Sequence, residues 1–544
     1  MAEDKRMNLD RILVEEVGQW GRFQFKAVVL CALVAIMGGL QCYVYLFTVL
    51  KVKTRCLVPE CDDSTPQFSP PWLLNAVPSA GHSFDNCHRF PARIWNTSDS
   101  CPADWFIRNS SVRCEEYVYE HKNSAYYEFS LACDEWLPTL VGSVRTVGYM
   151  ICLPIMGLVT DRWGRRLALS LSAFYVACVG SSTYFARSYI SYITLSFAEQ
   201  LLGAWVFPCS YVLAVEYVGP KYRMFTGASI STSLAVGEIL LGFIAWLQPY
   251  WRHLILILYV PEFIFIIYIW IAPESVRWLM SKGRYDEALK ILKKVAEVNG
   301  KTLSEKTLKE FSEVKVETKE IASEPWLVCL IFKHKAVLLR CLITPIWWLT
   351  SILMYYGLTI ASVGISGNKY LNYTTSVAVQ VPGYWAAVLL MDRIGRKALV
   401  STGFLISGAC QIAFIFIPEG NYWLSLSVYL IGKMFIAGVT TSLYVYTAEL
   451  YPTRHRTSLL AFSSMIGRVG GILAPLMPGL AAVVWVHLPF LVFGVLALVS
   501  GLLVLLAPET LGAPLPDSMD EAAELGTTSQ FTLCRSRKKS YNVN

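Results

Sequence analysis

The chain has 544 residues, of which 54% are hydrophobic and 16% are charged, and its formal net charge is +7. Soluble globular domains are roughly 45–50% apolar and about one-quarter charged, so this composition excludes a disordered chain, a coiled coil and an ordinary cytosolic enzyme. The excess of Lys and Arg over Asp and Glu is better explained by cationic loops beside a membrane than by nucleic-acid binding. The sequence has no basic patch interleaved with aromatic residues, which nucleic-acid binding would need.

Twelve segments are long and apolar enough to cross a bilayer, which takes about 20 residues of helix. We expect these spans at residues 27–50, 138–160, 167–186, 191–214, 225–247, 253–272, 338–362, 371–391, 398–417, 422–446, 458–482 and 487–507. The loops after spans 2, 4, 8 and 10 hold most of the Lys and Arg of the short loops. Cationic loops stay in the cytoplasm, so we expect both tails, 1–26 and 511–544, to be cytoplasmic.

The long loop at 51–137 is therefore predicted to be extracellular. It contains an even set of cysteines, namely Cys56, Cys61, Cys87, Cys101, Cys114 and Cys133. In an oxidising compartment, six cysteines predict three disulfides, with fifteen possible pairings. Glycosylation sequons begin at Asn96, Asn109 and Asn372. All three fall on the predicted outer side, where we expect them to carry glycans.

A second long segment, 273–337, is rich in Lys and Glu and is predicted to be a cytoplasmic linker with short amphipathic helices. It joins two stretches, 27–272 and 338–510, that carry the same motifs in the same order. The repeated motifs are Asp161-Arg162-Trp163-Gly164-Arg165-Arg166 with Asp392-Arg393-Ile394-Gly395-Arg396-Lys397, Glu216 and Arg223 with Glu449 and Arg456, and Pro273-Glu274-Ser275 with Pro508-Glu509-Thr510. Secondary transporters are often built from such parallel repeats. The sequence thus predicts an all-α membrane protein of twelve helices in two six-helix halves.

Several longer stretches of sequence resemble those of a known protein family. They include Glu16-Val17-Gly18-Gln19-Trp20-Gly21-Arg22-Phe23-Gln24, Cys56-Leu57-Val58-Pro59-Glu60, Pro273-Glu274-Ser275-Val276-Arg277-Trp278-Leu279 and Tyr446-Thr447-Ala448-Glu449-Leu450-Tyr451-Pro452-Thr453. With the repeated loop motif, they resemble the major facilitator superfamily and, within it, the organic ion transporter family, solute carrier family 22. The resemblance covers nearly the whole chain. It implies a twelve-helix plasma-membrane carrier of small organic ions that works by alternating access.

The resemblance also implies a role for the repeated acids and arginines on the cytoplasmic side. They are expected to brace a closed inner gate; the residues are Asp161, Arg165, Glu216, Arg223, Asp392, Arg396, Glu449 and Arg456. The alternative is simple anchoring of the loops by exposed basic residues. Anchoring explains the arginines but not the acids that recur in register.

Ionisable residues inside spans are candidates for substrate contacts, because they are expensive to place in lipid. Arg468 lies near the middle of span 11, where its guanidinium offers two parallel donors to a carboxylate; helix pairing is the alternative. In the family that the chain resembles, cation carriers tend to have Asp at this position and Glu at the position of Gln380. The sequence therefore favours organic anions or zwitterions.

Other polar and aromatic side chains could complete the binding site. Glu238 in span 5 would bind the ammonium of a zwitterion or pair with Arg468 in an empty site; a structural ion pair between helices is the alternative. Aromatic residues of span 7 are expected to line a cavity and to offer π faces to an ammonium, with plain packing as the alternative; they are Tyr355, Tyr356, Trp347 and Trp348. Arg145 in span 2 is either a contact at the outer mouth or a partner of Glu199 in span 4.

The predicted function is that of a plasma-membrane secondary transporter of small organic ions, with a lean to carnitine-like or β-alanine-like anions and zwitterions. An organic cation transporter is the alternative, and a non-transporting receptor is the alternative of another class. The sequence contains no metal-binding, nucleophile or phosphate-binding motif, so we expect neither an enzyme nor a cofactor. The expected partners are the organic ion and the lipid bilayer; uniport, exchange and coupling to Na⁺ or H⁺ are all compatible with these motifs.

Overall fold

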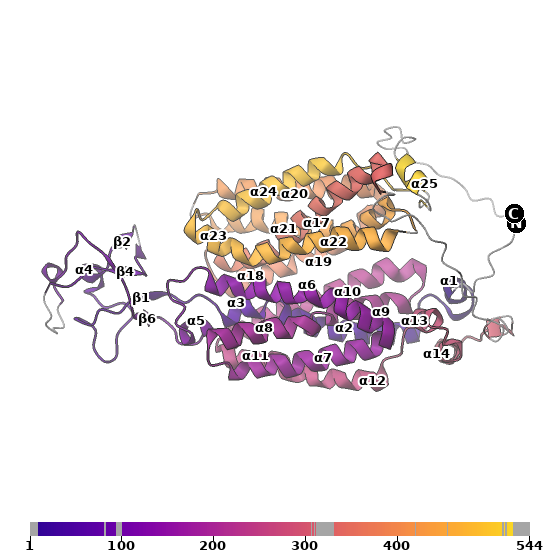
Figure 1. Ribbon diagram of the computed structural model, residues 1–544, viewed down its shortest axis with the longest axis horizontal. Coiled ribbons are helices and arrows are strands. Elements are labelled where there is room, and N and C mark those ends of the chain that lie inside the picture. The colour runs from indigo at the N-terminus through magenta and orange to yellow at the C-terminus, as the bar shows by residue number, and fades with distance from the viewer. Residues whose placement is uncertain are drawn as a thin grey trace.

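The computed structural model describes residues 9–80, 83–93, 101–305, 307–308, 311, 331–418, 420–453, 455–513, 516 and 519–525. In this part of the chain, eleven helices are long and apolar enough to span a membrane, and a shorter apolar helix lies at Leu488–Val504. The helices form two halves that lie side by side, violet to pink and orange to yellow in Figure 1. The predicted all-α architecture in two halves is confirmed, although the last span has only 17 residues of α-helix.

Each half has six spans, several of which are interrupted. The first half consists of α2 (Arg22–Cys42), α3 (Val44–Thr48), α6 (Leu137–Trp163), α7 (Arg165–Ser182), α8 (Tyr189–Gly203), α9 (Val206–Tyr217), α10 (Arg223–Leu247), α11 (Trp251–Tyr259), η5 (Val260–Ile267) and α12 (Tyr268–Ile271). The second half consists of α17 (Lys335–Ala361), α18 (Lys369–Ala378), α19 (Gln380–Ile394), α20 (Arg396–Ile415), α21 (Tyr422–Leu450), α22 (Arg456–Leu473), η7 (Ala474–Leu476), α23 (Met477–Val483) and α24 (Leu488–Val504).

Most of the interruptions coincide with prolines; the break at Tyr43 between α2 and α3 does not. Pro208, Pro382 and Pro475 lie next to the breaks between α8 and α9, between α18 and α19, and at η7. Pro261 opens the 3₁₀ stretch η5 in span 6. A proline inside a helix removes one backbone donor and collides with the carbonyl four residues earlier. The breaks at prolines therefore follow from local sequence, although the span predictions treated these segments as continuous.

The segment between α3 and α6 forms a small separate unit, the loop domain, which projects from one end of the bundle (Figure 1). Three two-stranded antiparallel sheets and two short helices make it up: β1 (Thr54–Cys56) with β6 (Tyr117–Tyr119), β2 (Ser79–Ala80) with β3 (Ser83–Phe84), β4 (His88–Arg89) with β5 (Val112–Arg113), α4 (Leu73–Ala76) and α5 (Ala125–Glu128). Its buried Arg55 forms an ion pair with Asp62 at 2.6 Å and lies over the ring of Trp72.

All six cysteines that the sequence singled out pair within the loop domain. The disulfides are Cys56–Cys114, Cys61–Cys101 and Cys87–Cys133. The apolar cluster beside them is small, so the covalent links supply much of what a larger core would otherwise provide. The predicted disulfide-containing loop is thus confirmed.

Removing the Cys87–Cys133 disulfide is expected to reduce delivery of the protein to the cell surface more than its affinity for substrate. The disulfide closes a loop of 46 residues next to α6, which corresponds to about 4 kcal/mol in the chain-entropy picture. Surface biotinylation and uptake kinetics of the double variant Cys87→Ala/Cys133→Ala would measure the two effects. Cys178→Ala, at an exposed free thiol of α7, is the matched control. Normal surface delivery of the double variant would contradict this role.

The structure separates the three predicted glycosylation sites. Asn96 lies outside the described residues, and Asn109 is exposed in a turn of the loop domain, where a glycan has room. Asn372 is fully buried; its amide donates to the carbonyl of Ile365 at 3.1 Å and accepts from the hydroxyl of Tyr422 at 2.7 Å. A glycan cannot be attached to this side chain in this conformation, so the prediction at Asn372 is withdrawn.

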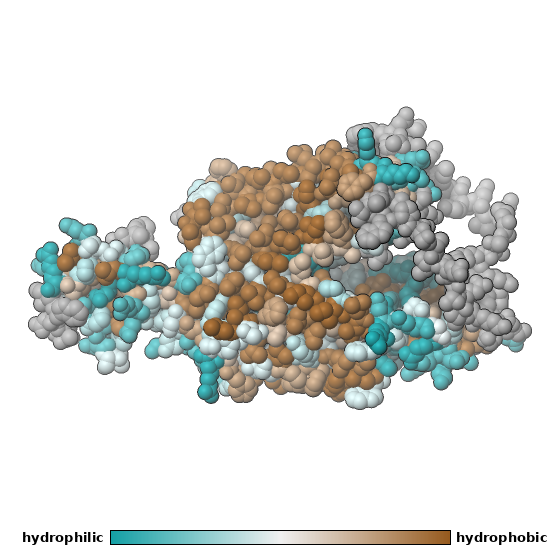
Figure 2. Space-filling view, in the orientation of Figure 1, coloured by the Kyte–Doolittle hydropathy of each residue, from teal (hydrophilic) through white to brown (hydrophobic). Residues whose placement is uncertain are grey.

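Hydrophobic side chains cover the flank of the bundle, while hydrophilic ones gather on the loop domain and at the opposite end (Figure 2). This distribution suits a protein whose middle faces lipid. At the end away from the loop domain, α1 (Leu9–Ile12) and η1 (Leu13–Val17) pack on α13 (Val276–Ser281) and α14 (Tyr285–Val298). There too, α25 (Met519–Glu524) packs against α17. The described part of the predicted linker thus includes the helices α13 and α14.

Candidate functional site

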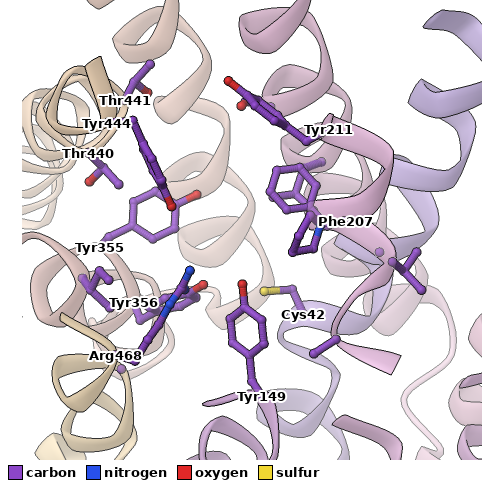
Figure 3. A pocket seen from close by; sticks show the side chains of 18 of the residues that line it. Cys42, Tyr149, Phe207, Tyr211, Tyr355, Tyr356, Thr440, Thr441, Tyr444 and Arg468 are labelled. Atoms are coloured by element: carbon purple, nitrogen blue, oxygen red, sulfur yellow. The ribbon is translucent and has the colours of Figure 1, made fainter. Parts of the chain in front are cut away.

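A cavity of about 740 Å³ lies between the two halves. Helices α2, α6, α9 and α10 of the first half and α17, α19, α21 and α22 of the second half contribute to its wall. Tyrosines from both halves point toward one another across it (Figure 3). The bundle is hollowed between the halves toward the end where α1 and α25 lie (Figure 2).

Aromatic side chains close the end of the bundle next to the loop domain. Phe47 of α3 stacks on Tyr370 of α18 with ring centroids 5.6 Å apart, and it meets Tyr373 edge-on at 5.0 Å. Tyr43 lies 6.1 Å from Tyr356 of α17. These rings come from opposite halves, so they form a seal. The cavity is therefore closed toward the loop domain and open toward the other end.

Arg468 of α22 projects into this cavity (Figure 3). A Cβ at Gly467 would meet Trp348 at 2.8 Å and one at Gly470 would meet the carbonyl of Leu349 at 2.5 Å, so only glycine allows α22 to pack this closely on α17. The guanidinium carbon of Arg468 lies 4.7 Å from the ring centroid of Tyr149, and its Nε has no hydrogen-bond partner. A guanidinium with unused donors in a low-dielectric cavity is suited to bind an anion.

The charges along the cavity wall are all positive. Arg145, Arg223 and Arg468 line the cavity, and no carboxylate does so among the described residues. Arg145 is paired with Glu199 and Arg223 with Asp10. Arg468 forms no ion pair in the described part of the chain, so it is the cation of the wall that is available to a ligand.

Glu238 does not face the cavity as the sequence suggested. It is 1% exposed, and neither of its carboxylate oxygens has a hydrogen-bond partner among the described residues. Its electrostatic partner is Lys433 of α21, in the other half, and not Arg468. The ammonium of Lys433 donates to the carbonyl of Tyr355 and, at 2.6 Å, to the hydroxyl of Thr359. The described residues therefore give Glu238 no direct ion pair; Lys433 acts on it electrostatically from the other half, and the structural ion pair stays an interpretation.

Glycines explain why Glu238 is turned away. A Cβ at Gly237 would lie 1.9 Å from the carbonyl of Ile36, and one at Gly39 would lie 2.1 Å from that of Leu234. The backbones of α2 and α10 therefore touch at this level. The neighbouring Glu238 is consequently held in the interface between helices and not at the cavity surface.

The predicted residues of spans 7 and 8 divide into two groups. Tyr355 and Tyr356 line the cavity (Figure 3). Gln380 is buried behind the wall and accepts hydrogen bonds from the hydroxyls of Tyr355 at 2.6 Å and Tyr384 at 2.8 Å. Gln380 therefore orients two cavity tyrosines instead of contacting a ligand.

Trp347 is fully buried and stacks on Tyr446 with ring centroids 5.8 Å apart, whereas the neighbouring Trp348 lines the cavity. The helical period predicts this, because Trp348, Ile352 and Tyr356 are spaced by four residues and share one face of α17. Of the two tryptophans that the sequence singled out, the structure places Trp348 at the cavity wall and Trp347 in packing against Tyr446.

Some cavity residues were not predicted. Tyr149, Tyr211 and Tyr444 point into the cavity (Figure 3), but a tyrosine in a span gives no signal that separates lining from packing. Arg145 of α6 lies at the wall, and its Nη2 is 3.0 Å from Oε1 of Glu199 in α8. The sequence left two roles open for Arg145, a contact at the outer mouth or an ion pair with Glu199. The structure shows the ion pair with Glu199.

The repeated acids and arginines form the same ion pairs in each half. Arg165 lies 3.3 Å from Asp161 and 3.6 Å from Glu216. Arg396 lies 2.9 Å from Asp392 and 3.1 Å from Glu449. The sharp turn before each arginine is made by a glycine with positive φ, Gly164 at 99° and Gly395 at 102°.

A third acid completes each cluster. The carboxylate of Glu274 accepts the backbone N–H of Arg165 at 3.0 Å, and that of Glu509 accepts the backbone N–H of Arg396 at 3.0 Å. Burial raises the pKa of Glu274 above its ordinary value, and the backbone N–H groups that it accepts oppose this shift. The two halves therefore carry equivalent three-acid clusters at the open end of the cavity.

These ion pairs lie within each half and do not join the halves. Arg223 is bound to Asp10 of the N-terminal tail, which also pairs with Arg277. Arg456 has no ion pair among the described residues. Because the cavity is open at this end, the predicted brace across the halves is absent from this conformation. A brace in the closed state stays a prediction.

Replacing Glu449 with glutamine is expected to slow transport several-fold without changing surface delivery. The change leaves Arg396 without its partly buried partner and removes an acceptor for the hydroxyl of Thr510. Initial uptake rates normalised to surface protein would measure it. Glu287→Gln, which removes an exposed pair with Arg284 on α14, is the control and should have no effect. Equal rates for both variants would favour mere anchoring.

Comparison with known proteins gives one family match. The family model described as "Sugar (and other) transporter" matches residues 105–521. The chain is 32% identical over 473 residues to mouse "Solute carrier family 22 member 3", covering 85% of this chain and 84% of the relative. It is 30% identical over 527 residues to "Organic cation transporter protein" of Drosophila melanogaster, covering 94% of each chain. It is 33% identical over 416 residues to human "Solute carrier family 22 member 2", covering 75% and 73%.

A solved structure shows the same fold. An inward-open conformation of the xylose transporter XylE from E. coli aligns with a TM-score of 0.59 and 15% identity, covering 92% of this chain and all of the other. At this identity the similarity shows the fold alone, which is the major facilitator fold in two halves.

Proposed function

Because the chain belongs to the sugar (and other) transporter family and, within it, to solute carrier family 22, we propose that it carries small organic ions with a carboxylate group across the plasma membrane. The family and the fold are those of multi-pass membrane transporters and not of enzymes. The coarser function, secondary transport of organic ions, rests on these comparisons; the preference for a carboxylate rests on the cavity.

The observation that carries the preference is the charge of the cavity wall. Arg468 lines the cavity without an ion pair, and no described carboxylate lines it. A carboxylate placed on Arg468 would gain charge-assisted hydrogen bonds away from bulk water. A simple organic cation would meet an uncompensated positive charge there. We therefore assign the substrate carboxylate to Arg468.

Organic cations are the second candidate, and the names of the relatives favour them over the anion or zwitterion. The Drosophila relative is named an organic cation transporter protein. The cavity also offers π faces that suit an ammonium, those of Tyr211, Tyr355, Tyr356 and Tyr444. A zwitterion such as carnitine or β-alanine would use both features, with its ammonium on the rings and its carboxylate on Arg468.

In this proposal, the two tails and the open end of the cavity face the cytoplasm, and the loop domain lies outside. The three disulfides of the loop domain support this orientation, because such links persist in oxidising compartments. The acids and arginines at the open end, from Asp161 to Arg456, would then belong to the inner gate.

The test is uptake of labelled L-carnitine, β-alanine, benzoate and tetraethylammonium by cells that express the chain, against cells that do not. We expect accumulation of at least one carboxylate and little accumulation of tetraethylammonium. Uptake of tetraethylammonium alone would establish the second candidate instead. Absence of all uptake by protein present at the surface would contradict both candidates.

A further inference from the structure

A second group of buried ionisable residues lies in the first half, next to the cavity. Arg145 of α6 contacts Glu199 of α8 in a two-pronged ion pair, and its Nη2 also donates to the carbonyl of Gln41 of α2 at 3.1 Å. Glu262 of η5 is the remaining acid. It is fully buried, and neither of its oxygens has a hydrogen-bond partner among the described residues.

The charges in this group do not balance. The nearest charged neighbour of Glu262 is Glu199, which has the same sign, and the guanidinium of Arg145 is already taken by Glu199. Two carboxylates and one guanidinium leave one negative charge in excess. An isolated buried carboxylate is costly, so the site must hold one further positive charge.

A proton fits this site better than a metal ion. A hard cation such as Ca²⁺ or Mg²⁺ takes about six oxygen ligands, and no cluster of three or more metal-binding side chains occurs among the described residues. Glu262 is also fully buried and is not among the residues that line the cavity. A proton needs no such set of ligands, since it binds directly to one carboxylate oxygen.

The proton has a short route to the cavity. Gln41 is the polar neighbour of Glu262, and its Nε2 has no hydrogen-bond partner. Gln41 and Arg145 both line the cavity. The elements packed against η5 carry further titratable groups: Arg165, Arg166, Tyr175 and Cys178 of α7, Arg252, His253 and Tyr259 of α11, and Tyr268 of α12. Arg165 and Arg166 lie in the first turn of α7 beside Glu274, and Arg252 is paired with Glu128, so Arg145 is the described cation that contacts Glu199.

We propose that Glu262 is a proton-binding site that couples substrate transport to the movement of H⁺. The inference rests on the proposed function, because it takes the substrate to carry a carboxylate. With Glu262 ionised, the group bears one negative charge and repels a carboxylate in the cavity. With Glu262 protonated, the group is neutral and the repulsion is gone. By linkage, the bound substrate strengthens proton binding by the same factor.

The consequence is symport of carboxylate and proton. The proton comes from water in the cavity on the loading side, binds to a carboxylate oxygen of Glu262 and returns to water on the release side; no bond of the substrate changes. If the substrate were an organic cation, it would bind more strongly when Glu262 is ionised. Substrate and proton would then compete, and the carrier would exchange one for the other.

The transport test uses the full chain in proteoliposomes. The probe is whichever of L-carnitine, β-alanine and benzoate the cells accumulate. We expect an inward proton gradient to stimulate uptake, and KM to rise by about fivefold or more as pH increases through the titration of Glu262. Glu262→Gln should keep exchange of internal for external substrate but lose both pH effects, and Glu262→Asp should retain them. Glu116→Gln, at an exposed position of the loop domain, is the control.

Two results would overturn the proposal: wild-type uptake that does not respond to the proton gradient, or a full response in Glu262→Gln. A measurement without substrate separates this from failure of the proposed function. The infrared carbonyl band of a protonated carboxylic acid should be present in the wild-type protein, reduced in Glu262→Gln and unchanged in Glu116→Gln. An unchanged band in Glu262→Gln would show that Glu262 holds no proton, whatever the protein transports.

Discussion

Replacing Arg468 with lysine is expected to lower carboxylate uptake by about tenfold or more, although the positive charge is kept. Lysine cannot present the two parallel donors of a guanidinium, and a hydrogen bond to a charged group contributes about 1.5–3 kcal/mol. Arg468→Asp should abolish carboxylate uptake, because it places a negative charge in a cavity whose described wall has no other carboxylate. Initial uptake rates normalised to surface protein would measure both effects.

Arg223 provides the control for the substitutions at Arg468. Arg223 also lines the cavity, but it is bound to Asp10, so Arg223→Lys should change substrate affinity far less than Arg468→Lys. If Arg468→Asp still carried carboxylates at the wild-type rate, the assignment of the substrate carboxylate would be wrong. If it gained transport of tetraethylammonium, the cavity charge would be confirmed as the determinant of selectivity.

Replacing Arg145 with methionine is expected to destabilise the protein severely, by about 3–5 kcal/mol. The buried carboxylate of Glu199 would then be left without its cation. The loss should appear as a lower melting temperature in detergent and as reduced surface delivery. The double variant Arg145→Met/Glu199→Gln should recover much of the loss, because it removes both charges of the pair.

The exposed ion pair between Lys51 and Glu135 is the control for this experiment. Its nitrogen and oxygen are 2.6 Å apart, but the Lys51 side chain is 53% exposed. Lys51→Met should therefore cost less than about 1 kcal/mol. If Arg145→Met were no more harmful than Lys51→Met, the ion pair with Glu199 would not be a stabilising element of the first half.

Much of the architecture could be predicted from the sequence, because it depends on local signals. An apolar run of about 20 residues reflects the thickness of the bilayer, and the cysteines of one outer loop share one compartment. The ion pairs Arg165–Asp161 and Arg396–Asp392 join residues only four positions apart across a glycine turn, so their repetition could be predicted from the local sequence. Most of the breaks in the spans also lie at prolines, although the break at Tyr43 does not.

The direction of side chains could not be predicted where it depends on contacts between distant segments. Glu238 is turned from the cavity by the close approach of Gly39 and Gly237, which lie on different helices. Asn372 is buried by Tyr422, 50 residues farther along the chain. Trp347 and Trp348 were both candidates, and the helical period could have separated them, because Trp348 shares a face with Ile352 and Tyr356.

The most direct test of the carboxylate assignment is a double-mutant cycle between protein and substrate. Uptake of L-carnitine and of its methyl ester, which lacks the carboxylate charge, would be measured with the wild-type protein and with Arg468→Gln. We predict that the wild-type protein prefers carnitine by about tenfold or more and that Arg468→Gln treats the two compounds nearly alike. The same preference for carnitine in both proteins would contradict the central claim that Arg468 binds the substrate carboxylate.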